Sequence, residues 1–144
     1  MKLILDDVLD SELKDYLLSQ DGIIDVQITN KDDIGEINIT FDNRITPLLI
    51  MKYIELFQNN DHITIMAFDK GTNSKLKQIK YLIDDLCCEY CYKGLIYELF
   101  KNKYIKSVKS NFDFNKPAFN IELLIEYDSN YNEEELVKYI NDNI

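Results

Sequence analysis

Three cysteines stand within five residues of one another, at Cys87, Cys88 and Cys91. Thiolates are soft donors that favour Cu(I) and Zn(II). Two residues separate Cys88 from Cys91, which lets both sulfurs turn toward one ion. The cluster therefore predicts a soft-metal site. Two alternatives stay open, namely thiol redox chemistry and packing of cysteine as a small apolar side chain.

The cysteines stand where the chain is expected to enter a helix at about residues 89–102. Free N–H groups and the positive dipole end at a helix start lower the pKa of a thiol toward the thiolate form. Two thiolates suit Cu(I) with few other ligands. Zn(II) requires two more donors, from Cys87, Glu89 or a second molecule. The expected ligands are Cys88 and Cys91, with Cys87 as a further donor, and absence of any metal is the alternative.

The composition and net charge of the chain indicate which classes of partner to expect. The 144 residues are 46% apolar, which predicts a packed core, and the net charge is −10. Phosphate binding needs a basic surface, so we expect no nucleic-acid partner and no anionic membrane surface. The sequence shows neither a signal-peptide pattern nor an apolar run of about 18 residues, and we expect a cytoplasmic protein. In that compartment, clustered cysteines are more often thiols or ligands than structural disulfides.

No pattern indicates catalysis. His62 is the single histidine and lies far from the cysteines in sequence. A hard-metal site that combines His62 with Asp6, Asp7 and Asp10 is a minor possibility beside a surface histidine. No glycine-rich phosphate loop is present. We therefore expect a protein that is not an enzyme.

The chain repeats itself. Residues 2–8 read KLILDDV and residues 80–86 read KYLIDDL, 78 residues apart. Residues 36–42 correspond to 122–128 and residues 51–54 to 137–140, at a spacing of 86. A repeat predicts one structural unit used twice. The eight extra residues are expected near 111–119, in a loop.

The first copy predicts the order β-α-β-β-α-β. Asp10 is the expected N-cap of the first helix, and Gly22 is expected to end it. Thr46 with Pro47 predicts the start of the second helix. Apolar residues at periods of two and of 3.6 give the strands and helix faces: strands at Leu3–Leu5, Ile24–Ile28, Ile37–Phe41 and Ile63–Ala67, and helix faces with Leu13, Tyr16 and Leu17 and with Ile50, Tyr53, Ile54 and Phe57.

The second copy reads β-α-β-β-α and stops. Its expected elements are strands at 79–83, 105–112 and 119–127 and helices at 89–102 and 132–141. The predicted domains are residues 1–69 and 79–144, with a linker at 70–78. Without a fourth strand, residues 79–83 form an open sheet edge, which invites a partner strand. We expect that edge to pair with the first half, a second chain or another protein.

Each half resembles the heavy-metal-associated domain family, the ferredoxin-like modules of copper chaperones and metal-pumping ATPases. The first half carries GIIDVQI at 22–28 and FDNRITP at 41–47, similar to the helix-to-strand joint and the third strand of that family. The second half carries LCCEYC at 86–91, which resembles the M-x-C-x-x-C metal loop with Cys88 and Cys91 at the ligand positions and Leu86 in place of methionine. The resemblance implies an α+β fold of two ferredoxin-like βαββαβ units in tandem, the second lacking its fourth strand.

The resemblance also implies a function. Asp10 and Leu13 stand where the cysteines would fall in the first half, so only the second half is expected to bind a metal ion. The expected task is trafficking or sensing of a soft, copper-like metal ion. One alternative is an interaction module that keeps the fold without the metal and uses the open sheet edge. A third is a small-ligand regulatory domain of the ACT type, which shares the element order.

Overall fold

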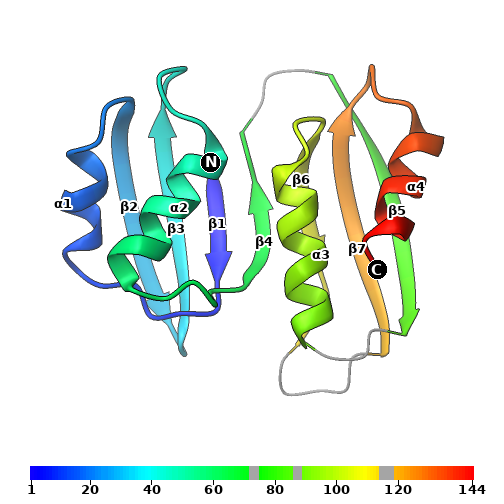
Figure 1. Ribbon diagram of the computed structural model, residues 1–144, viewed down its shortest axis with the longest axis horizontal. Coiled ribbons are helices and arrows are strands. Elements are labelled where there is room, and N and C mark those ends of the chain that lie inside the picture. The colour runs from blue at the N-terminus through cyan, green and yellow to red at the C-terminus, as the bar shows by residue number, and fades with distance from the viewer. Residues whose placement is uncertain (72–74, 86–88, 114–118) are drawn as a thin grey trace. The chain divides into compact units, whose positions relative to one another are not determined.

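The computed structural model describes residues 1–71, 75–85, 89–113 and 119–144. The chain divides into two compact units, Met1–Ile65 and Met66–Ile144 (Figure 1). The elements in chain order are β1 (Lys2–Leu5), α1 (Leu13–Leu18), β2 (Ile23–Lys31), β3 (Ile34–Phe41), α2 (Pro47–Gln58), β4 (Ile65–Asp69), β5 (Leu76–Asp85), α3 (Glu89–Lys101), β6 (Ile105–Ser110), β7 (Phe119–Asp128) and α4 (Glu133–Asp142).

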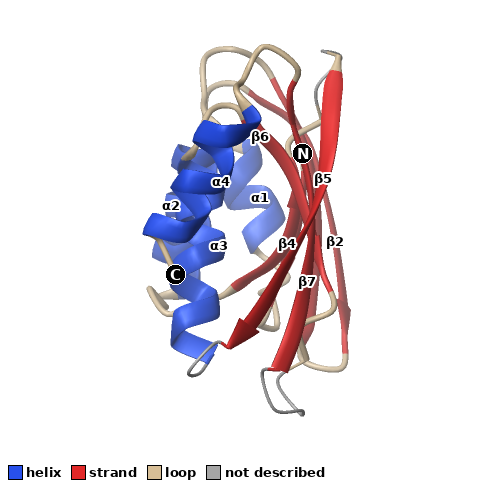
Figure 2. Cartoon of the chain, turned by 90° about the vertical axis from the view of Figure 1, so that its right-hand side faces the viewer, coloured by secondary structure: helices blue, strands red, loops and turns tan. Residues whose placement is uncertain are grey.

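The first unit is an antiparallel sheet in the order β2-β3-β1 with α1 and α2 on one face (Figure 2). Alternate residues of each strand point to that face, which is why the apolar period of two in the sequence becomes a buried layer. The layer between sheet and helices is closed to solvent. Its fully buried members include Leu3, Leu5, Leu13, Leu17, Val26, Ile37, Ile50, Met51 and Ile54.

The second unit carries the sheet order β4-β6-β7-β5, again antiparallel, with α3 and α4 on one face. The strand expected to complete the first copy, β4, pairs here with β6 through Phe68 and Val108. The next strand, β5, begins at Leu76, inside the segment predicted as a linker. The fully buried core includes Tyr92, Leu95, Ile96, Leu99, Val108, Leu123, Ile125, Leu136 and Ile140.

The two units share their strand register. Leu3 lies opposite Ile37 in the first unit. Tyr81 lies opposite Leu123 in the second. The spacing of 78 relates Leu3 to Tyr81, and the spacing of 86 relates Ile37 to Leu123, so the two pairs correspond as the repeat predicts. The repeat in the sequence is therefore also a repeat in backbone hydrogen bonding.

A register shift stands at the same place in both units, at Ile23/Asp25 in β2 and at Ile105/Ser107 in β6. Such a bulge inserts one residue and changes which side chain faces the core. The bulge explains why the alternation of apolar residues misplaces one side chain: Ile23 is buried, whereas Ile24 is 59% exposed. The prediction that Ile24 faces the core is wrong.

The bulged isoleucines are 82 residues apart, between the spacings of 78 and 86. The eight extra residues therefore do not all fall near 111–119. Half of them precede β6, where α3 has 13 residues and α1 has six.

Three of the four helices that the structure describes, α2, α3 and α4, begin within one residue of the position that the sequence predicts. Thr46 caps α2, because its side chain accepts a hydrogen bond from the N–H of Leu49, and Asn132 caps α4 in the same way. Asp10 does not cap α1. Its Oδ1 accepts from the N–H of Glu12 at 2.8 Å in a turn, and α1 begins only at Leu13.

Gly22 lies in the turn before β2, beyond the end of α1 at Leu18. Its φ of +94° and the 3.0 Å between a Cβ there and Ile45 Cγ2 make glycine necessary at this position. None of the described helices has both the length and the apolar character needed to span a bilayer.

Candidate metal centre

Cys91 is the predicted ligand that the structure describes. It lies in the first turn of α3, directly after β5, and its side chain is half-buried. Its sulfur takes part in a disulfide. For Cys91, the expectation that the clustered cysteines are thiols or ligands rather than disulfide-bonded is therefore wrong. The other predicted ligands, Cys87 and Cys88, lie outside the described residues.

The neighbouring residue fixes the start of α3. Tyr92 is fully buried, and its hydroxyl donates to the carbonyl oxygen of Met66 at 2.8 Å. Its ring stacks on Phe112 with centroids 4.0 Å apart and planes 8° from parallel. Burial raises the pKa of Tyr92 to about 12, against a smaller opposing effect of a hydrogen bond with Ser110. Tyr92 therefore stays a neutral donor and holds the backbone beside Cys91.

Cys91 belongs to a helical turn that the first unit lacks. Leu13 and Leu17 are both fully buried on α1. On α3, two pairs have the same four-residue spacing and 0% exposure, Tyr92 with Ile96 and Leu95 with Leu99. The spacing of 82 between the bulged isoleucines selects the second pair, so Leu13 corresponds to Leu95 rather than to Cys91, the counterpart expected from the sequence. The extra turn at the start of α3 carries the cysteine.

The corresponding joint of the first unit is closed by amide side chains. Asn30 accepts from the N–H of Leu9 and donates to its carbonyl oxygen, both at 2.8 Å. Gln58 accepts from the N–H of Asp10 at 2.8 Å and donates to Val8 O at 3.0 Å and to Asp7 Oδ2 at 3.2 Å. The segment between β1 and α1 is thus fixed from two sides.

Close packing under this segment needs a glycine in β3. A Cβ at Gly35 would lie 2.5 Å from Leu9 Cγ and 2.7 Å from the carbonyl oxygen of Asp7. The matching position of the second unit is Ile121, which is 3% exposed. A surface pocket of about 560 Å³ lies beside the segment, lined by Leu9, Ser11, Lys14, Gln27, Ile28, Thr29 and Asn30.

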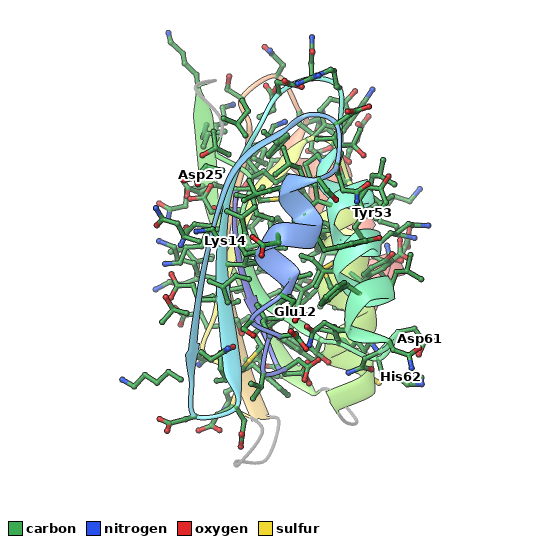
Figure 3. All side chains as sticks on the ribbon, turned by 90° about the vertical axis from the view of Figure 1, so that its left-hand side faces the viewer. Glu12, Lys14, Asp25, Tyr53, Asp61 and His62 are labelled. Atoms are coloured by element: carbon green, nitrogen blue, oxygen red, sulfur yellow. The ribbon has the colours of Figure 1, made fainter. Side chains whose placement is uncertain are left out.

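The acids and the histidine of the first unit do not converge. The carboxylate of Asp6 accepts from the N–H of Thr64. His62 projects outward with its Nε2 3.3 Å from Asp61 Oδ1, and both side chains are more than 80% exposed (Figure 3). Among the residues that the structure describes, no three His, Cys, Asp or Glu side chains form a group able to hold a metal ion. The described residues give no support to the hard-metal site considered from the sequence.

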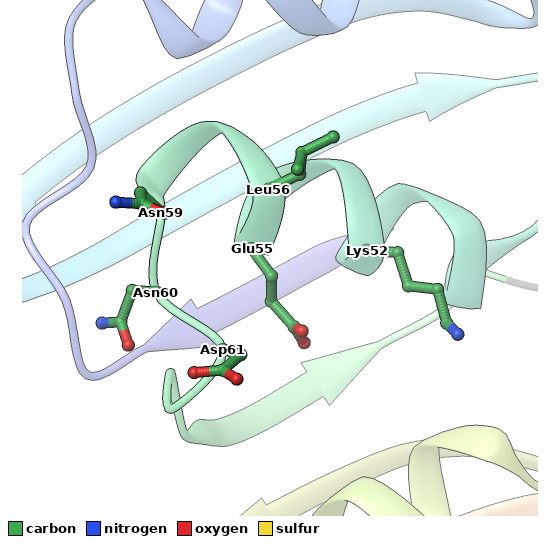
Figure 4. A pocket seen from close by; sticks show the side chains of 6 residues that line it. All are labelled: Lys52, Glu55, Leu56, Asn59, Asn60 and Asp61. Atoms are coloured by element: carbon green, nitrogen blue, oxygen red, sulfur yellow. The ribbon is translucent and has the colours of Figure 1, made fainter.

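A second surface pocket, of about 370 Å³, lies along the C-terminal half of α2 (Figure 4). Its charged members are Lys52, Glu55 and Asp61, beside Leu56, Asn59 and Asn60. Leu56 is 69% exposed, so the pocket is a shallow and open surface. It offers two carboxylates, fewer than a hard cation prefers.

Comparison with known proteins adds little. No protein-family model matches the chain, and no curated protein matches it. A solved structure of the N-terminal soluble domains of Bacillus subtilis CopA is similar over 99% of this chain and 88% of that one, at 11% identity and a TM-score of 0.36. At these values the likeness assigns neither a family nor a function.

Proposed function

We propose that the second unit binds one soft metal ion, Cu(I) foremost, through the cysteines at the start of α3, for trafficking or sensing and without catalysis. One observation carries the proposal: Cys91 lies at a strand-to-helix joint and its sulfur is joined to another cysteine sulfur. The first unit then supplies structure. The two units are proposed to be tandem copies of one ferredoxin-like module, which their shared register supports.

The donor set favours Cu(I) over Zn(II). Two thiolates satisfy Cu(I), whereas Zn(II) needs four donors. No third and fourth donor gather near Cys91 among the described residues. Zn(II) would thus need Cys87, Glu89 or a second molecule to complete its shell.

Metal binding requires the reduced protein. A disulfide sulfur is a poor ligand compared with a thiolate. Reduction takes two electrons and two protons, breaks the S–S bond and leaves two thiols, which lose their protons as the metal binds. The disulfide of Cys91 therefore excludes the metal until a reductant opens it.

A competition titration tests the proposal. The full chain, purified anaerobically, is titrated with Cu(I) and with Zn(II) against a chelator of known affinity, once reduced and once oxidised. We expect one tightly bound Cu(I) in the reduced protein alone. Cys88→Ser and Cys91→Ser should each weaken binding by at least about a hundredfold, some 2.7 kcal/mol. An affinity equal to that of an unstructured dithiol peptide, or unchanged by both substitutions, would contradict the proposal.

The competing function is protein interaction through an open sheet edge. The specific observation in its favour is β5, the last strand in the sheet order of the second unit. The titration separates the two functions, because an interaction module without a metal site binds Cu(I) no more tightly than an unstructured dithiol peptide does.

A further inference from the structure

The second unit ends in a long and regular edge strand. β5 has ten residues and runs opposite β7 without a register shift. Within the part of the chain that the structure describes, β7 is the strand that pairs with β5, and no strand pairs with its other side. Figure 2 shows this strand in front, with α4 beside it on one face.

The other terminal strand in the sheet order differs. β2 is also an edge, but its bulge at Ile23/Asp25 interrupts the ladder. Bulges are one of the ways in which proteins protect an edge from pairing. β5 lacks that protection and exposes an apolar side chain, Leu82, at 56%.

The charges of β5 select the partner. Its sequence, LKQIKYLIDD, places both lysines in the first half and both aspartates at the end. A lysine on an edge normally discourages an added strand. An antiparallel copy of β5 instead brings its aspartate half beside the lysine half. A parallel copy would align like charges, and the strand is neutral within a chain of net charge −10.

We propose that two copies of this chain pair through β5, antiparallel, with Leu82 opposite Leu82 and each Lys80 opposite Asp84 of the second copy. A twofold axis perpendicular to the sheet keeps the helices of both copies on one side. The hydroxyl of Tyr81 donates a hydrogen bond to Asn141 of α4, so Tyr81 lies on the helix-covered face of the sheet. Because side chains alternate along a strand, Lys80, Leu82 and Asp84 lie together on the opposite face.

The side chains are free to make these contacts. Asp84 is exposed and has no ionic partner among the described residues. Lys80 is 66% exposed and lies 3.3 Å from Glu122, in a solvent-exposed pair that leaves its amine accessible. The interface is small, so the expected dissociation constant is on the order of 10–100 μM.

Sedimentation velocity tests the pairing on the full chain, metal-free and reduced, from roughly 5 to 500 μM around that constant. We expect a reversible dimer, also in a variant with all three cysteines changed to serine. Lys80→Glu and Asp84→Lys should each weaken the dimer roughly tenfold, because each sets like charges opposite one another. The double variant should restore it.

Leu82→Lys should dissociate the dimer, while Leu56→Lys, at a leucine 69% exposed on α2, serves as its matched control. Circular dichroism verifies that each variant is folded. Three results would each overturn the inference: a wild-type monomer at every concentration, no recovery in the double charge variant, or equal effects of Leu82→Lys and Leu56→Lys. Since no metal is present, the outcome is independent of the proposed metal function.

Discussion

The strand-to-helix joints of the two units differ although their strands share one register. In the first unit, Asn30 and Gln58 hold the segment after β1 by hydrogen bonds to its backbone. In the second, an added turn of α3 carries Cys91, and Tyr92 anchors that turn in the core. The same strand register therefore accommodates two different joints, one held by amide side chains and one that carries the disulfide-bonded Cys91.

Removing the aromatic anchor should give the largest effect. Tyr92→Ala deletes a fully buried ring, its stacking on Phe112 and its hydrogen bond to Met66. We expect a loss of about 3–5 kcal/mol in the free energy of unfolding. Tyr16 of α1, half-buried and stacked on Phe57 at 4.9 Å, is the matched residue of the first unit. Tyr16→Ala should cost only about 1–2 kcal/mol.

Urea unfolding and amide exchange along α3 measure both losses. Equal effects of the two substitutions would show that the second joint does not depend on its aromatic anchor.

Gly35→Ala should cause the next largest loss in the free energy of unfolding. The new methyl group meets Leu9 and the backbone of Asp7, and the backbone cannot yield as a side-chain tip can. We expect a loss of about 1–3 kcal/mol, with exchange rising first in residues 6–10. A neutral result would mean that the joint of the first unit is looser than its hydrogen bonds indicate.

Gly94→Ala, in the second unit, should raise the free energy of unfolding rather than lower it. Apart from its chain neighbours and the backbone of its own helix, no atom lies within 4 Å of a Cβ at this position, which is inside α3. Alanine should therefore stabilise the helix by about 0.5–1 kcal/mol. Thermal unfolding measures the gain, and a loss would show that the start of α3 needs a flexible residue behind it.

The second unit should also respond to pH through Lys70. Burial, helped by nearby Lys106, lowers the pKa of Lys70 to about 7, and its Nζ donates to Asn102 O at 2.9 Å. The unfolded chain keeps this proton up to its ordinary pKa of 10.5, while the folded chain releases it near 7. Stability should therefore rise between pH 7 and 10.

Above pH 10 the trend should reverse, because the raised pKa of Tyr92 keeps its proton in the folded state alone. Urea unfolding at several pH values gives the slope. Lys70→Met should flatten it and Lys103→Met, at an exposed lysine, should not. A slope that survives Lys70→Met would assign the effect to other groups.

The sequence predicted much of this fold. The spacings of 78 and 86 gave the partners of Leu3 and Tyr81, because register follows apolar alternation. Ile24 was misplaced, since a bulge leaves no mark in a period-two pattern. The contacts of Asn30 with Leu9 and of Tyr92 with Met66 join residues at least 21 apart, beyond any local signal.

The sequence placed Cys91 at the start of the helix that follows the first strand of the second copy, and the structure has it in the first turn of α3. The extra turn of α3 was not predicted, because the spacing of 78 between β1 and β5 suggested that Cys91 corresponds to Leu13. The spacing of 82 between the two bulges matches Leu13 to Leu95 instead.

The proposed function assigns a soft metal ion to the second unit and none to the first. Two-dimensional amide NMR of the reduced full chain during addition of Cu(I) tests it directly. We expect chemical-shift changes that saturate at one equivalent and concentrate at the start of α3, around Cys91 and Tyr92, while Leu9–Leu13 stay unchanged. Equal shifts in both joints, or no saturable shift at α3, would contradict it.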